Sequence, residues 1–485
     1  MMISSKGSKF ANKEDEAGNK GLHGHQHSSF LIPHSSLNDS PIARWTVLFI
    51  VATAMMMGYF VNDVMSPLEA LLEAPKEAGG LGWTPGDYGF FSGSSGLINV
   101  FLLMLFFSGL ILDKMGVRFT GTLACSLMVV GTLLKLYGIT ADFGPDTVAF
   151  IGFNLPMSVA VSSLGFAVFG VGYEMTGITV SKAMVRWFTG HELALAMGIQ
   201  LAMARLGTAA ALSISAPIAR HFTLSTPLLV SLSFLIIGLL AFLVFCVMDR
   251  RLDATSPHFP IEDESDTSSS DSDEFRLSDI AVTLRNPGFW LITLFCVLFY
   301  SAVSPFLKFS TKLMVMKYGI DADIAGIFSS IAPFGTILMT PLFGLLYDRY
   351  GKGVTLVITG AMLLAGVHFG FSLPMHSSAV AIALMVVLSV GYSLAPAALW
   401  PCVPKIIPLK CLGTAYSMIF LIQNFGRAII PMFVGKANET DPTYTTSMLI
   451  FGFTALGAAV VAVAMLYTDR KKGYGLQLPN IKKHY

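Results

Sequence analysis

The sequence predicts an all-α membrane protein with twelve transmembrane helices in two six-helix halves. Three observations indicate this fold class. Of the 485 residues, 54% are hydrophobic and only 13% are charged, whereas about 25% of the residues in a soluble domain are charged. Twelve runs of about 20 mostly apolar residues are each long enough to cross a bilayer as a helix. A long polar stretch separates the first six runs from the last six.

The composition excludes several other classes of protein. Transmembrane barrels alternate apolar and polar residues over about 10 positions, which these runs do not. The net charge of +1 implies no bulk attraction to nucleic acid. The five cysteines form no CxxC pair, so we expect neither a disulfide framework nor a metal site. Because there is also no phosphate-binding Walker loop, we predict no cofactor and no enzymatic activity.

The apolar runs divide the chain into five parts. We predict a disordered cytoplasmic tail at 1–43, an N-terminal six-helix bundle at 44–248, an acidic Ser-rich cytoplasmic linker at 249–286, a C-terminal six-helix bundle at 287–467 and a basic cytoplasmic tail at 468–485. The expected membrane helices are 44–65, 86–110, 117–139, 158–185, 193–218, 226–248, 287–313, 324–347, 354–372, 378–402, 412–434 and 445–467. The linker is either a solvated spacer or a phosphorylation-controlled switch.

The distribution of lysine and arginine predicts the orientation in the membrane. With both termini in the cytoplasm, the cytoplasmic loops are richer in these residues than the opposite loops. The same topology puts Asn438-Glu439-Thr440, a glycosylation sequon, on the outer or luminal side. Asn438 is therefore a candidate for glycosylation.

A short motif occurs at the same point of each half. It combines a glycine, an aspartate, basic residues and a second glycine: Gly109, Asp113, Lys114, Gly116 and Arg118 in the first copy, and Gly344, Asp348, Arg349 and Gly351 in the second. The first glycine of each copy is expected to let a neighbouring helix approach closely. The charges could hold one conformation and release it as the halves rock. This repeated motif resembles that of the major facilitator superfamily, whose fold has two six-helix halves.

Two charged residues lie deep inside predicted membrane helices, where charges are costly and usually functional. Glu174 precedes the turn near Thr189-Gly190 by about 15 residues, and Arg205 follows it by about 16. At about 1.5 Å per residue, both lie roughly 22–24 Å from that turn. They form either a structural salt bridge or the two ends of one site. Such a site suits a zwitterion, with Glu174 for an ammonium and Arg205 for a carboxylate.

Longer segments resemble one branch of that superfamily. They are GYEMTGITVSKAMVRWFTGHELALAMGIQLAMARLGT at 172–208, FWLITLFCVLFYSAVSPF with PLFGLLYDRYG within 289–351, and GYSLAPAALWP with LGTAYSMIFLIQNFGRAIIP within 391–431. These are similar to the lysosomal dipeptide transporters, the family of major facilitator superfamily domain-containing protein 1. The resemblance covers nearly all of 44–470. It implies facilitated diffusion of dipeptides out of lysosomes, charge recognition in the first half by Asp63, Glu174 and Arg205, and a glycosylated lysosomal accessory subunit as a possible partner.

Other residues are candidates for the wall of a substrate site or for ordinary packing between helices. Aromatic rings suit variable side chains, and amides can hydrogen bond a peptide backbone. These candidates are Tyr59, Tyr173, Tyr392, Trp400, Gln423 and Asn424. Lys308 and Lys312 either extend toward the outer interface or take part in gating. Arg427 is expected to extend to the outer interface in the same way.

The sequence thus predicts a multi-pass transporter of dipeptides, or similar small zwitterions, that works by alternating access as a uniporter. A lysosomal or endosomal membrane is favoured, with the plasma membrane as the alternative. One other hypothesis is a proton-coupled carrier of small organic anions or sugars, with Glu174 as the proton site. Another is a receptor or scaffold that signals through the acidic linker.

Overall fold

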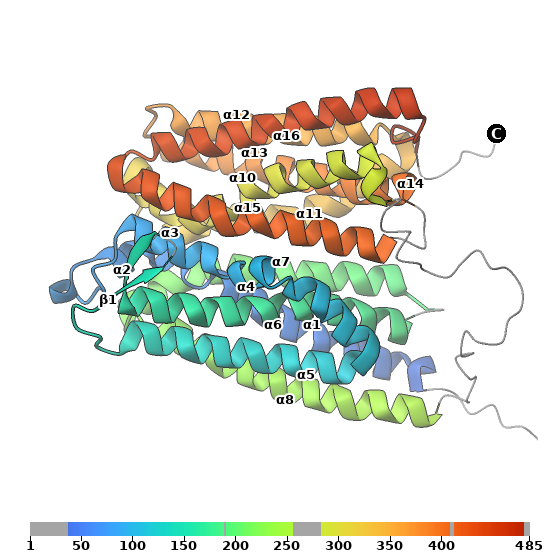
Figure 1. Ribbon diagram of the computed structural model, residues 1–485, viewed down its shortest axis with the longest axis horizontal. Coiled ribbons are helices and arrows are strands. Elements are labelled where there is room, and N and C mark those ends of the chain that lie inside the picture. Colours follow the sequence, from blue (N-terminus) through green and yellow to red (C-terminus); the bar gives the residue numbers. More distant parts are fainter. Residues whose placement is uncertain (1–36, 151, 189–190, 256–282, 408–411, 480–485) are drawn as a thin grey trace, which may run out of the picture.

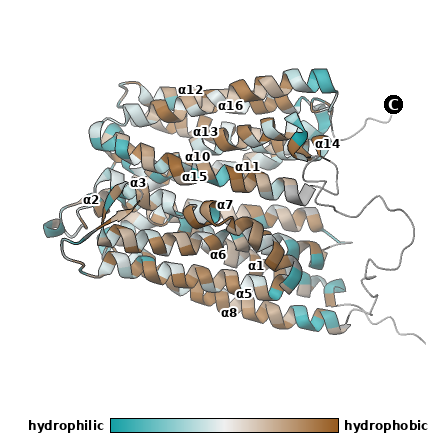
Figure 2. Cartoon of the chain, viewed as in Figure 1, coloured by the Kyte–Doolittle hydropathy of each residue, from teal (hydrophilic) through white to brown (hydrophobic). Residues whose placement is uncertain are grey.

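Two bundles of helices, one from each half of the chain, lie side by side in the computed structural model (Figure 1). The structure describes residues 37–150, 152–188, 191–255, 283–407 and 412–479. Hydrophobic residues cover the middle of the bundles, and hydrophilic residues gather toward their ends (Figure 2). Helices that cross a bilayer need this pattern, because their backbone polar groups pair internally and their side chains face lipid. The predicted helical membrane fold with two bundles is confirmed, apart from the number of spans.

The first half is built from helices with one short hairpin. Its elements are α1 (Pro41–Asp63), α2 (Glu69–Glu73), α3 (Pro85–Ser94), α4 (Leu97–Phe101), α5 (Met104–Thr140), β1 (Thr147–Phe150), β2 (Phe153–Pro156), α6 (Met157–Phe188), α7 (Leu193–His221) and α8 (Thr226–Thr255). Proline at the start and a Ser40 cap set the beginning of α1. A reciprocal capping box between Thr84 and Asp87 does the same for α3.

The second half contains no described strand. Its helices are α10 (Pro287–Tyr318), α11 (Ala325–Tyr350), α12 (Gly353–Ser372), α13 (Ser378–Leu399), α14 (Val403–Ile406), α15 (Leu412–Thr440) and α16 (Thr445–Lys472). Asn286 caps the start of α10, and Gly319 ends that helix in the left-handed conformation. The helical ends near Pro41, Thr255, Pro287 and Lys472 define what we call the termini side, at the right of Figure 1. The opposite end is the loop side.

The expected twelve continuous spans are reduced to eleven. Within the described ranges, eleven helical stretches are long and apolar enough to cross a membrane. The remaining expected span, 86–110, is divided among α3, α4 and the first turns of α5. Ser94, Ser95 and Gly96 favour helix ends over helix interiors, and Leu103 takes a left-handed φ of 53°. The apolar run was long enough, but these residues interrupt its helix.

Both copies of the repeated motif turn the chain in the same way. Gly116 kinks α5 with a φ of 77°, and Gly351 ends α11 with a φ of 70°. Glycine adopts such positive φ values without the steric cost that other residues meet. A Cβ placed on Gly109 or Gly344, by contrast, would meet no described atom within 4 Å. The expected close helix approach at these two glycines is therefore not found in the described part of the chain.

The basic residues of the motif region bind locally. Arg118 pairs with Asp253 at 2.7 Å and lies 3.7 Å from the buried Asp249, so it fastens the end of α8 to α5. Arg186 pairs with the same two aspartates. In the second copy, Arg349 lies over the Tyr350 ring. Lys114 is exposed, and Asp348 has at least one polar, ring or electrostatic contact. The side chain of Asp113 lies outside the described part of the structure.

The two halves meet most closely on the loop side. Helices α3 and α15 cross there with their backbones in contact, because a Cβ on Gly89 would come 2.5 Å from the Pro431 carbonyl oxygen and 2.8 Å from the Gly435 Cα. Arg220 and Asp323 add an ion pair between the halves at 3.4 Å. Small residues at such crossings allow close van der Waals packing, which drives helix association in membranes.

Candidate functional site

A cavity of about 290 Å³ lies between the two halves. This is near the lower end of the range for small-molecule sites, about 300–1,000 Å³. Most of its lining comes from α1, α3, α6 and α7 of the first half and from α10, α13 and α15 of the second. The structure brings eight of the nine predicted substrate-binding residues to this lining: Tyr59, Asp63, Tyr173, Glu174, Arg205, Tyr392, Trp400 and Gln423. The ninth, Asn424, is buried beside it.

Asp63 is held at the end of α1 by partners from both halves. Its Oδ1 pairs with the Lys308 ammonium of α10 at 2.7 Å, and its Oδ2 accepts from the Thr208 hydroxyl of α7 at 2.8 Å. Lys308 also donates to the Asn62 carbonyl oxygen. Both charged side chains are about nine-tenths buried. The alternative in which Lys308 extends to the outer interface is thus wrong, since the residue closes a buried pair.

Glu174 pairs with Arg427, a residue that the sequence predicts at the outer interface. The Arg427 Nη1 of α15 donates to Glu174 Oε1 at 2.9 Å and to Asn424 Oδ1 at 3.3 Å. The prediction that Arg427 extends to the outer interface is therefore wrong. It turns inward because α15 lies against the first half, where a carboxylate at the same depth offsets its charge.

Arg205 binds an aromatic residue of the other half. Its Nη1 donates to the Tyr392 hydroxyl at 2.7 Å, and its guanidinium lies 5.0 Å from the centre of the Tyr392 ring. Since Glu174 has Arg427 as its partner, the two predicted charges have different partners within one cavity. The predicted alternative of a salt bridge between Glu174 and Arg205 is therefore wrong, and their role as two ends of one substrate site stays a prediction.

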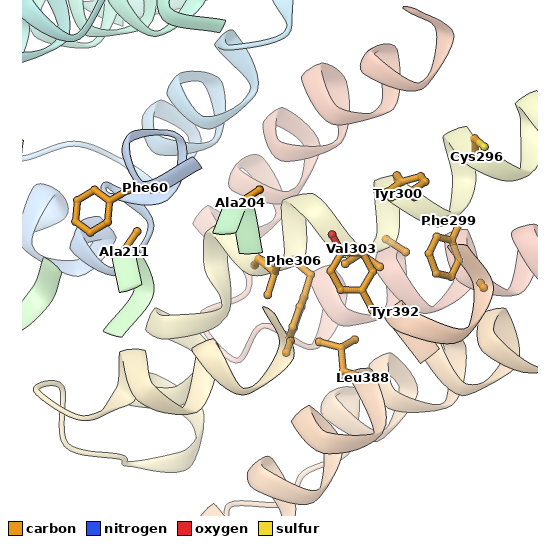
Figure 3. Packing of buried hydrophobic residues seen from close by; sticks show 14 of the residues in the cluster. Phe60, Ala204, Ala211, Cys296, Phe299, Tyr300, Val303, Phe306, Leu388 and Tyr392 are labelled. Atoms are coloured by element: carbon orange, nitrogen blue, oxygen red, sulfur yellow. The ribbon is translucent and has the colours of Figure 1, made fainter. Parts of the chain in front are cut away.

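Aromatic side chains form much of the wall. Tyr59 and Tyr173 pack edge to face at 4.9 Å between ring centres. Trp400 donates to the Tyr300 hydroxyl at 3.2 Å and packs on Phe420. Figure 3 shows Tyr300 of α10 and Tyr392 of α13 among buried apolar side chains. These rings are rigid, so they fix the shape of the cavity at little entropic cost.

Three contacts of the charged cavity residues cross between the halves. Asp63, Glu174 and Arg205 belong to the first half, and Lys308, Arg427 and Tyr392 to the second. Toward the loop side a fourth crossing contact follows, in which Lys312 pairs with Glu69 at 3.4 Å and with Glu73. Lys312 thus lies in a buried pair and does not extend to the outer interface, while its part in gating stays a prediction. A ligand that competes for these charges would change how the halves are joined.

One buried charged residue near the cavity, Lys135, is not among the residues predicted from the sequence. Lys135 of α5 is fully buried, donates to the Val61 carbonyl oxygen at 3.1 Å and lies 4.5 Å from the centre of the Phe166 ring. It supports the end of α1 just before Asn62 and Asp63. The signal was available, because Lys135 stands alone in a run of apolar residues and intramembrane charges are functional by default.

The sequon side chain is buried. Asn438 is 5% exposed within α15, and its Oδ1 accepts from the Ser447 hydroxyl. A glycan requires an accessible amide nitrogen, so this position argues against modification of the folded protein. We expect that PNGase F will cause the same mobility shift, or none, in the wild type and in Asn438→Gln. A shift that Asn438→Gln removes would show that the end of α15 is open when the glycan is added.

Comparison with known proteins agrees with this architecture. The family model of the Major Facilitator Superfamily matches residues 48–431. The lysosomal dipeptide transporter MFSD1 of Homo sapiens is 27% identical over 389 residues, which cover 77% of this chain and 77% of that protein. Its counterpart in Gallus gallus is 29% identical over 314 residues, covering 63% and 68%. The resemblance inferred from the three long segments is therefore confirmed.

Solved structures confirm the fold. The inward open conformation of the xylose transporter XylE from E. coli has a TM-score of 0.66 at 13% identity, covering 91% of this chain and 98% of that one. A crystal structure of the peptide transporter POT in complex with alafosfalin has a TM-score of 0.64 at 14% identity, covering 90% and 96%. The family match spans most of the chain, and the chain therefore belongs to the major facilitator superfamily of membrane transporters.

Proposed function

We propose that this protein moves dipeptides, or similar small zwitterions, across a membrane by alternating access. The observation that carries the proposal is a cavity between the halves that presents carboxylates and guanidinium groups together. A dipeptide has an ammonium and a carboxylate separated by a short backbone. Its ammonium would bind Glu174 and its carboxylate would take the fork of Arg205, since such charge-assisted bonds are short and directional.

The crossing contacts give this binding a mechanical consequence. A substrate that binds Glu174 or Arg205 competes with Arg427 or Tyr392 and so loosens contacts between the halves. The loop side is closed by the α3–α15 crossing and by Lys312 with its two glutamates. We infer that the cavity opens toward the termini side in this conformation. Rocking about the cavity would then expose it to the other side.

The membrane assignment is also a proposal. The lysine- and arginine-rich loops favour a cytoplasmic termini side, and the human and chicken relatives are named as lysosomal transporters. We propose a lysosomal membrane with both termini in the cytoplasm, and an accessory subunit as a possible partner. A protease-protection assay on intact lysosomes tests the orientation, because tags at both ends should be cleaved without detergent.

Uptake by reconstituted protein tests the transport proposal. Proteoliposomes loaded with an unlabelled dipeptide such as Ala-Ala should accumulate external labelled Ala-Ala by exchange. N-acetyl-Ala-Ala and Ala-Ala-amide should compete poorly, because each lacks one of the two charges. Absence of exchange with every dipeptide, from protein shown to be folded, would contradict the proposal.

Uniport makes a separate prediction about driving force. A uniporter equilibrates its substrate, so an imposed pH gradient is expected to leave the final internal concentration of Ala-Ala equal to the external one. Proton coupling would instead raise the internal concentration above the external one when the outside is acidic. The measurement is the plateau of labelled uptake with and without the gradient, with ionophore-treated vesicles as the control. Accumulation that the ionophore abolishes would contradict uniport.

A second candidate function is transport of small organic anions. Arg205 favours it, because its described polar partner is a tyrosine hydroxyl rather than a carboxylate. Mono- and dicarboxylates without an amine distinguish the two functions. If they exchange as well as Ala-Ala does, the ammonium site at Glu174 is not used.

A further inference from the structure

The charges that line the cavity do not cancel. Asp63 and Glu174 are acidic, and Arg205, Lys308 and Arg427 are basic. With all five ionised, the described lining carries a formal charge of +1. Two pairs are already made, Asp63 with Lys308 and Glu174 with Arg427. The remaining positive charge is on Arg205, which leaves the cavity ready for an anion.

Arg427, which lines the same cavity as Arg205, has N–H groups that donate no described hydrogen bond. Its two described hydrogen bonds, to Glu174 and Asn424, both come from Nη1. A guanidinium has five N–H donors in a planar fork. The side chain lines the cavity and is 22% exposed. Arg427 can therefore bind a second acceptor that enters the cavity.

We propose that Arg427 determines specificity and makes this transporter prefer dipeptides that carry an acidic side chain. The inference rests on the proposed function and goes further by naming the substrate class. The substrate ammonium takes Glu174 from Arg427, and Arg427 then takes the side-chain carboxylate. Arg205 binds the terminal carboxylate. In the empty protein, Arg427 occupies the place that the substrate ammonium fills.

The charge balance is the physical reason. An acidic dipeptide carries a net charge of −1 at neutral pH, so its complex with a +1 cavity is neutral. A neutral dipeptide leaves +1 in the complex, and a basic dipeptide leaves +2. Uncompensated charge is unfavourable in the low-dielectric interior of a membrane protein. A neutral dipeptide that displaces Arg427 from Glu174 also leaves the Arg427 guanidinium without a carboxylate partner. The side-chain carboxylate of an acidic dipeptide supplies that partner.

Competition by matched dipeptides tests the preference. Ala-Glu, Ala-Gln and Ala-Lys differ in side-chain charge but have similar length. Each is added to proteoliposomes of the full chain that take up labelled Ala-Ala at pH 7, and its half-inhibitory concentration is measured. We expect Ala-Glu to compete at a concentration about tenfold lower than Ala-Gln, and Ala-Lys to be the weakest. Equal competition by Ala-Glu and Ala-Gln would overturn the inference while leaving dipeptide transport in place.

Variants assign the preference to one residue. In Arg427→Gln, the half-inhibitory concentration of Ala-Gln divided by that of Ala-Glu should fall to about one. In Lys436→Gln, this ratio should stay at the wild-type value. Lys436→Gln is a suitable control because this substitution also removes a positive charge from α15, but at an exposed position outside the cavity lining. If Arg427→Gln does not fold, Arg427→Lys keeps the charge without the fork and should retain part of the preference. A tenfold ratio that survives in folded Arg427→Gln would overturn the assignment. Failure of all dipeptides to compete in the wild type would instead refute the proposed function.

Discussion

Replacing Arg205 with alanine is expected to abolish dipeptide uptake in a protein that still folds. In the structure this guanidinium faces the cavity and binds Tyr392 of the opposite half. A hydrogen bond to a charged group contributes about 1.5–3 kcal/mol, so loss of a bidentate pair with the substrate carboxylate should weaken binding by roughly a hundredfold or more. Labelled Ala-Ala uptake and the thermal shift caused by Ala-Ala measure the loss.

Two further variants separate the role of Arg205 in binding from its contact with Tyr392. Arg205→Lys keeps the charge but loses the planar fork, so weak uptake should remain. Tyr392→Phe removes the hydroxyl that Arg205 binds but keeps the ring, so substrate should still bind. All variants are compared by size-exclusion profile and by unfolding temperature without ligand. Wild-type uptake by folded Arg205→Ala would refute the assignment of this residue to the substrate carboxylate.

Replacing Asp63 with asparagine is expected to destabilise the protein strongly. It removes the only described carboxylate partner of Lys308, which is buried between the halves. Removing one member of a buried pair costs about 3–5 kcal/mol, because the other charge is left without compensation. We therefore expect a large drop in unfolding temperature and little uptake from Asp63→Asn.

The double variant tests whether the unpaired charge is the cause. Asp63→Asn with Lys308→Met removes both charges, so much of the stability should return even if transport does not. Lys436→Gln removes a lysine whose side chain is 70% exposed from its pair with the half-buried Glu439, so it should change the unfolding temperature little. If Asp63→Asn is no less stable than Lys436→Gln, the pair seen here does not hold the halves together.

The sequence predicted the residues of the site better than their partners. Glu174 and Arg205 were identified because a charge inside an apolar run is costly without a function. Helical rise then put them at one depth, and both do line one cavity. Nothing local in the sequence showed that Arg427 reaches Glu174, because the two residues are 253 positions apart and on different halves.

The membrane helix predicted at 86–110 is interrupted in the structure, and the reason is local. Hydropathy averaged over a window shows that a segment is apolar, but it is insensitive to a few residues that end a helix. Ser94, Ser95 and Gly96 fall inside an apolar run and divide it. The turns at Gly116 and Gly351 show the opposite case, in which one residue type at a motif position accounts for the local geometry.

The sequence by itself determined that the chain is a helical membrane protein, that it has two related halves, and which charges lie at membrane depth. These properties follow from local composition and helical periodicity, because a bilayer admits only segments that satisfy their own backbone. The tertiary structure alone decided which charge pairs with which. Asp63 with Lys308, Glu174 with Arg427 and Arg205 with Tyr392 join residues 245, 253 and 187 positions apart. Such pairs depend on how the two bundles face one another, and the spacing of residues along a helix carries no information about that.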